Sequence, residues 1–172
     1  MSTIIVRRAT KKDAEIVADF SRKSFYDTYA ALNTKEDMDD YMSEHLSKEL
    51  MMDQVCSLKN IFYLAFVNNE LAGYIQLNDE NLPASLKEMN CLEIVRFYAA
   101  KEMIGKGIGS SLMKASIDHA RSINKNLLWL MVWQKNTRAI EFYKKWGFEI
   151  FDTNVFKLGK DLQDDWVMKK SL

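Results

Sequence analysis

Three of the six glycines in this chain, Gly105, Gly107 and Gly109, fall within five consecutive positions. They lie between a β-type run at 92–99 and an amphipathic helical pattern at 107–121. A turn of this kind exposes backbone N–H groups at the positive end of a helix dipole, where a phosphate group binds favourably. The chain is therefore expected to contain a strand–turn–helix unit with an anion-binding turn.

The spacing of these glycines excludes two common nucleotide-binding loops. A GxxxxGK(S/T) loop needs Ser or Thr after its lysine, but Gly107 follows Lys106. A GxGxxG fingerprint needs a further glycine at 110 or 112, and these positions hold Ser110 and Leu112. A shorter GxG loop remains, and taken alone it is equally consistent with a flexible turn that binds nothing.

The remaining residues alternate between β-type and helical patterns. The β-type runs are at 4–8, 61–67, 71–77, 92–99, 127–133, 148–158 and 166–169, and the helical patterns are at 12–31, from 35, and at 48–57, 107–121 and 136–146. Asn68 and Asn69 separate two β-type runs and predict a hairpin turn, because asparagine tolerates the left-handed backbone. This order is typical of an α+β protein around a mixed sheet, and the length suits one domain over residues 1–172.

Composition excludes several classes of function. Lysine plus arginine and aspartate plus glutamate cancel at 24 each, so no basic excess is present to neutralise a nucleic acid. No apolar run approaches the roughly 18 residues of a membrane span, and the N-terminus lacks the pattern of a secretory signal. Cys56, Cys91, His45 and His119 are isolated from one another, which argues against a disulfide framework and a metal site. We expect a cytoplasmic protein that binds neither nucleic acid, membrane nor metal.

A second motif follows the β-type run at 127–133. Asn136 stands at the N-cap of a helix that Gly147 ends, since glycine accepts the left-handed conformation found after a helix C-terminus. One face of this helix is formed by residues at i, i+3, i+4 and i+7, namely Ala139, Phe142, Tyr143 and Trp146. Each of these residues is individually consistent with an ordinary capped amphipathic helix.

The two motifs together form a more specific pattern. The sequence NxxAxxFYxxxGF at 136–148 begins 27 residues after the last glycine of the loop. In this combination, and over nearly its whole length, the chain resembles the GNAT superfamily of N-acetyltransferases. The resemblance implies an α/β/α fold of the α+β class, with a twisted, mixed but mostly antiparallel sheet of about seven strands and helices on both faces. It also implies an enzyme that moves acetyl from acetyl-CoA to a primary amine without an acyl-enzyme.

The resemblance also implies roles for particular residues. The strand before the loop would line the pantetheine arm and the acetyl group through Phe97, Tyr98 and Ala99. The pyrophosphate would bind the loop, which consists of Gly105, Lys106, Gly107, Ile108, Gly109 and Ser110. Asn136 would bond the pantetheine arm, and Tyr143 would protonate the leaving thiolate, with a core tyrosine as the alternative. Family members usually carry Gln or Arg where this chain has Ile104, which predicts weaker cofactor binding.

Glu93 interrupts the apolar strand that precedes the glycine loop. A charge at such a position is costly unless it is paired or used, and the attacking amine needs a group that takes its proton. Glu93 is therefore the candidate general base. The alternatives are a structural ion pair with Arg96 or a solvated strand edge. Strict alternation places Glu93 and Arg96 on opposite faces, which argues against the pair unless a bulge intervenes.

Residues 27–49 carry seven acidic side chains against two lysines, in a chain that is neutral overall. Glu36 and Asp40 lie one helical turn apart there, and Tyr26 and Tyr29 lie close by. We expect these four residues, together with Glu93, to bind a polycationic amine by charge attraction and cation–π contact. A solvated helix face is the alternative. Motifs at 24–29, 33–41, 92–98 and 129–133 also resemble the bacterial spermidine/spermine N-acetyltransferases of the PaiA type, which favours a polyamine substrate.

Other functions compete with this hypothesis. Enzymes of the same class acetylate protein N-termini, lysines or aminoglycosides, although a neutral peptide substrate would not need the acidic segment. A regulatory module that binds acetyl-CoA and catalyses little would account for Ile104, but it would have no need of Tyr143 as an acid. Exposed sheet edges are compatible with a homodimer.

Overall fold

The computed structural model describes residues 3–80 and 82–172. Its central element is a seven-stranded sheet in the order β1-β2-β3-β4-β5-β7-β6, in which β4 and β5 are parallel and all other neighbours are antiparallel. The strands are β1 (Ile4–Arg8), β2 (Ile61–Val67), β3 (Glu70–Asn78), β4 (Cys91–Ala99), β5 (Leu127–Trp133), β6 (Glu149–Leu158) and β7 (Asp161–Ser171). The predicted mixed, mostly antiparallel sheet is thereby confirmed.

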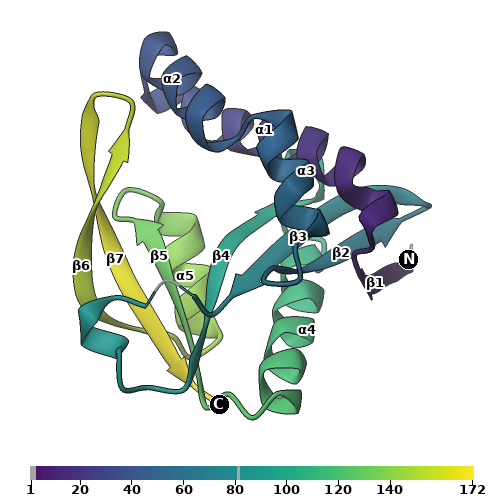
Figure 1. Cartoon of the computed structure of the whole chain (residues 1–172), viewed down its shortest axis with the longest axis vertical. Helices are drawn as coiled ribbons and strands as arrows, with labels where there is room; N and C mark the ends of the chain where they lie inside the picture. The colour runs from purple at the N-terminus through teal and green to yellow at the C-terminus, as the bar shows by residue number, and fades with distance from the viewer. Residues whose placement is uncertain (1–2, 81) are drawn as a thin grey trace.

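Helices cover both faces of this sheet, as predicted (Figure 1). One apolar core joins α4 (Ile108–Ser122) and α5 (Thr137–Lys145) to the sheet. A second core joins α1 (Ala14–Tyr29), α2 (Lys35–His45) and α3 (Lys48–Cys56) to the opposite face. Short 3₁₀ turns lie at Lys11–Asp13, Ala30–Leu32, Ala84–Leu86 and Lys101–Met103. None of the helices in the described residues is long and apolar enough to cross a membrane.

Local sequence signals set the ends of several elements. Asn68 and Asn69 have φ values of 50° and 66°, so the β2–β3 connection is the predicted tight turn. Thr34 accepts a hydrogen bond from the backbone N–H of Asp37 and thereby caps α2. The final strand is longer than the sequence pattern indicated, because residues 161–169 pair with β6 and residues 165–171 pair with β5.

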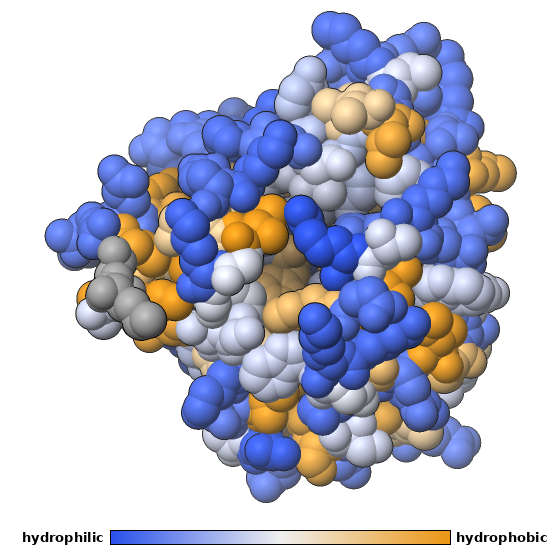
Figure 2. Space-filling view, turned by 180° about the vertical axis from the view of Figure 1, so that it is seen from behind, coloured by the Kyte–Doolittle hydropathy of each residue, from blue (hydrophilic) through white to orange (hydrophobic). Residues whose placement is uncertain are grey.

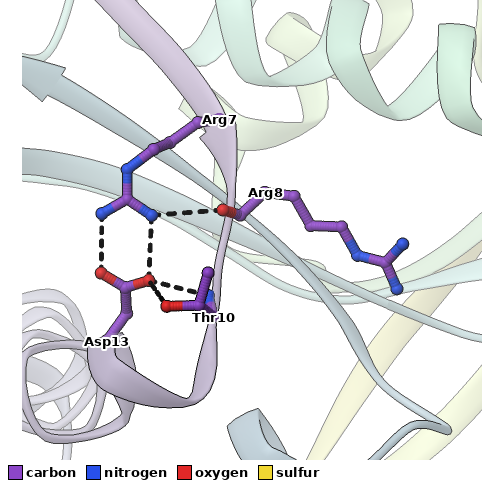
Figure 3. Close-up of polar contacts among 4 residues, drawn as sticks. All are labelled: Arg7, Arg8, Thr10 and Asp13. Carbon is purple, nitrogen blue, oxygen red and sulfur yellow. Dashed lines mark hydrogen bonds and ion pairs between the residues drawn. The ribbon is translucent and has the colours of Figure 1, made fainter.

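The start of α1 is anchored to β1 through Asp13 (Figure 3). The guanidinium of Arg7 donates two hydrogen bonds to the Asp13 carboxylate, at 2.7 and 2.9 Å. Thr10 adds its backbone N–H and its hydroxyl, at 2.7 and 2.9 Å. These donors, Arg7 above all, hold the pKa of Asp13 well below its usual range. The anchor determines where α1 leaves the sheet, and α1 carries Tyr29 at its far end.

The two parallel strands separate partway along their length. β4 and β5 pair only at 91–94 and 127–130, although the strands continue to Ala99 and Trp133. Beyond these residues β4 remains bonded to β3, and β5 remains bonded to β7. The facing edges therefore present backbone N–H and C=O groups that have no strand partner on that side among the described residues, and a ligand that enters the gap can pair with them.

Candidate active site

A cleft of about 710 Å³ occupies the gap between the diverging ends of β4 and β5. It is lined by Phe142 and Tyr143 from the α4–α5 side and by Tyr29 and Tyr41 from the opposite side. The cleft therefore connects the two faces of the sheet. Figure 2, a view from behind the sheet, shows a surface hollowed near its centre, with pale and apolar side chains inside a rim of hydrophilic ones.

The glycine loop lies at one wall of the cleft. Gly107 is the N-cap residue of α4 and has a φ of 88°, in the left-handed region that favours glycine. Because Gly107 has no side chain, no side-chain hydrogen bond caps the start of α4. The first N–H groups of this helix are therefore available to an anion. Gly105, Gly109 and Ser110 also line the cleft. This arrangement can hold a pyrophosphate.

Two loop residues expected at the pyrophosphate lie elsewhere. The Lys106 side chain is exposed outside the cleft, and the Ile108 side chain is buried in the α4–α5 core. Ile108 packs so closely on β3 that a Cβ at Gly73 would lie 2.7 Å from its Cγ2. Gly73 thus allows the start of α4 to approach the sheet. Ile108 could contact a phosphate only through its backbone N–H.

Three cations line the cleft near the loop and the start of α5, namely Lys101, Lys135 and Arg138. Lys101 is close enough to the glycine loop in the sequence to be a candidate for added charge there, whereas Lys135 and Arg138 were not predicted for the site. Lys135 and Arg138 flank the predicted site residue Asn136 in the sequence, and this proximity was the available signal. Their charges suit the phosphate groups of a coenzyme.

The predicted site residues of α5 line the cleft. Asn136 caps the helix, because its Oδ1 accepts a hydrogen bond of 3.3 Å from the backbone N–H of Ala139. Tyr143 lies two turns further along and is buried. Burial raises the pKa of the Tyr143 hydroxyl well above its usual value, so this group stays protonated at neutral pH and can donate a hydrogen bond.

The residues of the free edge of β4 alternate between the two faces. The ring of Phe97 packs against Phe142 and Tyr143, with centroids 5.7 and 6.3 Å apart. Tyr98 points to the other face and contacts Tyr74, with centroids 6.0 Å apart. Phe97, Tyr98 and Ala99 all line the cleft, so an extended ligand in the gap would lie against this edge.

Glu93 lies where β4 and β5 begin to separate, and it lines the cleft. Burial raises the pKa of its carboxyl to about 7, while the nearby Arg96 charge acts in the opposite direction. No ion pair or hydrogen bond joins the Glu93 side chain to another among residues 3–80 and 82–172. The alternative of a structural Glu93–Arg96 pair is therefore absent.

The expectation that Glu93 and Arg96 point to opposite faces is wrong. Gln76 of β3 pairs with Arg96, and Leu77 pairs with Ile94, so Val95 is an extra residue in β4. The extra residue is a β-bulge, and it shifts the alternation of side chains by one position for the residues of β4 that follow it. Both side chains consequently lie on the α1–α3 face.

The opposite end of the cleft has an aromatic wall. Phe25 stacks on Tyr41 with centroids 4.9 Å apart, and Tyr29 lies 4.6 Å from Phe25 and 6.1 Å from Trp133. Phe156 of β6 closes the wall 5.3 Å from Tyr41. All of these residues line the cleft. Such a surface can hold an alkyl chain and the face of a cation.

Asp165 of β7 is a second buried carboxylate in the cleft, and the sequence analysis missed it. The residue is 6% exposed, and its Oδ1 has no hydrogen-bond partner among the described residues. Burial raises the pKa of Asp165 to about 6, with a smaller contribution from neighbouring Asp164. The sequence signal was its alternation with the buried Val167 in a strand-like run.

The expected acidic lip lies outside the cleft. Tyr26, Glu36 and Asp40 are exposed, and none of them lines it. Glu36 instead accepts a hydrogen bond of 2.7 Å from the ammonium of Lys160, in the β6–β7 turn. Of the five residues expected to bind substrate, the cleft brings together Tyr29 and Glu93.

The diverging parallel strands and the uncapped glycine loop define an acyl-CoA-dependent transferase. The family model described as the acetyltransferase (GNAT) family matches residues 22–148, and the chain belongs to this family. It is an N-acetyltransferase that uses acetyl-CoA. The cleft residues fit this cosubstrate, because the loop offers N–H groups to phosphates and the free edge of β4 offers a backbone to an extended arm.

Three known proteins illustrate the relationship. An "uncharacterized N-acetyltransferase in pepI 3′ region" of Lactobacillus delbrueckii subsp. lactis is 31% identical over 172 residues, which cover 100% of this chain and 99% of the relative. The spermidine N(1)-acetyltransferase of Thermoplasma acidophilum is 26% identical over 88% of this chain and 92% of its own. The crystal structure of PaiA N-acetyltransferase from Thermoplasma acidophilum in complex with coenzyme A has a TM-score of 0.81 and 25% identity, and covers 99% of both chains.

Proposed function

We propose that this enzyme acetylates a primary amine of a polyamine by direct attack of the amine on acetyl-CoA. The observation that carries the proposal is the meeting of Glu93, Tyr143 and the glycine loop in one cleft at the divergence of β4 and β5. No cysteine or histidine is among the described residues that line this cleft. An acyl-enzyme on such a side chain is therefore not part of the proposed reaction.

Glu93 acts as the general base in this proposal. An alkylammonium is mostly protonated at neutral pH, and only the free amine attacks. The Glu93 carboxyl has a pKa raised to about 7, which suits a group that accepts a proton near neutral pH. It takes the proton from the amine directly or through a water molecule.

Tyr143 acts as the general acid. As the new N–C bond forms and the C–S bond breaks, the sulfur of coenzyme A leaves as a thiolate that needs a proton. The protonated hydroxyl of Tyr143 supplies it, and solvent returns the proton afterwards. A backbone N–H on the free edge of β4, at 97–99, stabilises the negative charge that develops on the thioester oxygen.

The remaining cleft residues hold the cosubstrate. The N–H groups at 105–110 bind the pyrophosphate, assisted by the charges of Lys135 and Arg138. Asn136 binds the pantetheine arm beside β4. Ile104 carries no polar group to add to this site, so the backbone contacts are the main ones.

The polyamine assignment rests on two observations. The 26% identical relative from Thermoplasma acidophilum is named for spermidine acetylation. The acceptor end of the cleft combines the carboxylates of Glu93 and Asp165 with the rings of Tyr29 and Tyr41. This combination of negative charge and aromatic faces suits a flexible polycation.

A thiol-release assay with acetyl-CoA and a panel of amines tests the proposal. The panel comprises spermidine, spermine, putrescine, an aminoglycoside and a short peptide with a free N-terminus and a lysine. We expect kcat/KM for spermidine or spermine to exceed that for the peptide at least tenfold. Turnover of the peptide alone would move the enzyme to the protein-acetylating class. Binding of acetyl-CoA without turnover of any amine would support a regulatory module.

A further inference from the structure

Asp165 has no role in the acetyl transfer described above, yet it is the most buried carboxylate that lines the cleft. A buried carboxylate oxygen without a donor is costly, and proteins rarely retain one without a use. We propose that Asp165 binds the second, non-reacting ammonium group of an elongated amine acceptor. This inference rests on the proposed function, and it names the group that selects the substrate.

The surroundings of Asp165 suit an ammonium group. Tyr29 and Tyr41 line the same cleft as Asp165, and the Tyr29 ring centroid lies 6.1 Å from that of Trp133. Burial raises the pKa values of both tyrosine hydroxyls, and the charge of Asp165 adds to that rise. Trp133 is the direct strand partner of Asp165 and also lines the cleft. A carboxylate within an aromatic wall stabilises a desolvated cation through its charge and through the ring faces. An uncharged acceptor would leave the same carboxylate unpaired.

The strand register places Asp165 at a useful distance from Glu93. Glu93 pairs with Trp129 of β5, and Asp165 pairs with Trp133. Four residues of strand separate these two levels, about 13 Å at roughly 3.3 Å per residue. An acceptor that delivers one amine near Glu93 and another to Asp165 must therefore be an extended chain.

Both carboxylates also lie on the same face of the sheet. The residues that follow them, Ile94 and Trp166, pack on the α4–α5 core. Because strand side chains alternate, Glu93 and Asp165 point away from that core toward the α1–α3 side. The acceptor chain can thus run along one face of β5, under the aromatic wall.

Two sets of variants separate Asp165 from the other acidic groups. Asp165→Asn removes the charge without changing the size of the side chain. Asp164→Asn is the matched control, because Asp164 is the neighbouring residue on the same strand but is exposed and does not line the cleft. Glu36→Gln with Asp40→Asn tests the exposed acidic residues of α2. Asp165→Asn should unfold at the same temperature as the wild type or higher, since it removes a destabilised charge.

The binding of spermidine to the protein saturated with coenzyme A, measured by titration calorimetry, decides the proposal. We expect Asp165→Asn to raise the Kd for spermidine at least tenfold, and the two control variants to change it less than threefold. Wild-type affinity in Asp165→Asn, or a wild-type protein that binds no spermidine, would overturn the proposal.

Turnover separates the failure of this inference from failure of the proposed function. 1,8-Diaminooctane and octylamine have the same carbon chain, which gives the diamine the length of spermidine, and they differ only in the second amine. The wild type should prefer the diamine or spermidine over octylamine, and Asp165→Asn should lose most of that preference. Retained preference in the variant would overturn the role of Asp165 and leave the acetyltransferase intact. Absence of turnover with every amine, together with a loss of spermidine binding in Asp165→Asn, would overturn the proposed function alone.

Discussion

Glu93 and Arg96 lie on the same face of β4, but they form no ion pair. The guanidinium of Arg96 instead donates hydrogen bonds of 2.7 Å to Gln54 and to Gln76, and a longer one to the carbonyl of His45. The Arg96 cation is thus bound by neutral acceptors. Burial raises the pKa of the Glu93 carboxyl by more than the charge of Arg96 lowers it. Glu93 is therefore a carboxylate with a pKa near neutral pH, and it lies where β4 and β5 begin to separate.

Glu93→Gln should reduce kcat/KM for the amine about 100-fold or more, because an amide cannot accept the proton. In the wild type, log kcat/KM should bend at about pH 7, with lower activity on the acidic side, where Glu93 is protonated. The bend should disappear in the variant, which leaves only the titration of the amine itself. A pH profile of thiol release checks this. An unchanged bend in Glu93→Gln would assign it to another group.

The same substitution should stabilise the fold at neutral and alkaline pH. The carboxyl has a pKa of about 7 in the folded protein against an ordinary value of 4.5. Between these values the folded state binds more protons than the unfolded state, so stability falls as pH rises. Glu93→Gln should exceed the wild type by roughly 1–3 kcal/mol at pH 8 and match it near pH 4. Urea unfolding at the two pH values measures the difference, and equal stabilities at pH 8 would contradict it.

Tyr143→Phe should lower kcat about 10- to 100-fold with little change in the Kd for acetyl-CoA, because it removes the hydroxyl and keeps the ring packing. Tyr26→Phe is the matched control, since Tyr26 is exposed and lies outside the cleft. Steady-state kinetics and calorimetric titration of acetyl-CoA separate the two effects. A full-activity Tyr143→Phe enzyme would show that this tyrosine is only part of the core.

Gly73→Ala should impair cofactor binding from a position outside the cleft. The added Cβ would lie 2.7 Å from the Ile108 side chain and 2.9 Å from the carbonyl oxygen of Tyr98. The start of α4 and the free edge of β4 must then move apart, which we expect to cost about 1–3 kcal/mol of stability. The KM for acetyl-CoA should rise several-fold. A variant with wild-type KM and wild-type unfolding temperature would show that the contact relaxes without moving the loop.

Asp13→Asn should destabilise the protein by about 1–2 kcal/mol. The amide has no negative charge and only one oxygen, so it cannot accept both hydrogen bonds from Arg7. The pKa of Asp13 is lower in the folded state than its ordinary 3.8, so its contribution is complete above that pH and is lost as the pH falls further. Asp19→Asn, on the same helix, is the control: Asp19 is exposed and pairs with Lys48, and we expect a loss below about 0.5 kcal/mol. Equal losses in thermal unfolding at pH 7 would contradict the anchor.

Local features of the fold could be predicted from the sequence because their causes lie within a few residues. The Asn68-Asn69 turn needs only residues that tolerate positive φ, and Asn136 caps α5 through an N–H three residues on. Gly147 ends the same helix with a φ of 84°. Together with the glycine loop, these signals were sufficient to predict the family and several of the residues that line the cleft.

The acceptor side depends on contacts between distant segments, which sequence patterns do not report. Glu36 and Asp40 formed an acidic stripe in the sequence, but packing of α2 beside the β6–β7 hairpin leaves that stripe outside the cleft (Figure 1). Asp165 enters the cleft only because β7 inserts between β5 and β6. The alternation of Asp165 with Val167 indicates a strand face, but no local pattern indicates which strands lie beside it.

The amino-acid sequence by itself determined the order of strands and helices, the glycine turn at Gly107 and the caps of α5, since backbone conformation and short-range hydrogen bonds control them. Only the tertiary structure decided which charges enter the cleft. A one-residue bulge at Val95 turned Arg96 onto the face of Glu93, and strand order brought Asp165 under the aromatic wall. Register and burial are properties of the assembled sheet, and they set the pKa values on which the proposed chemistry depends.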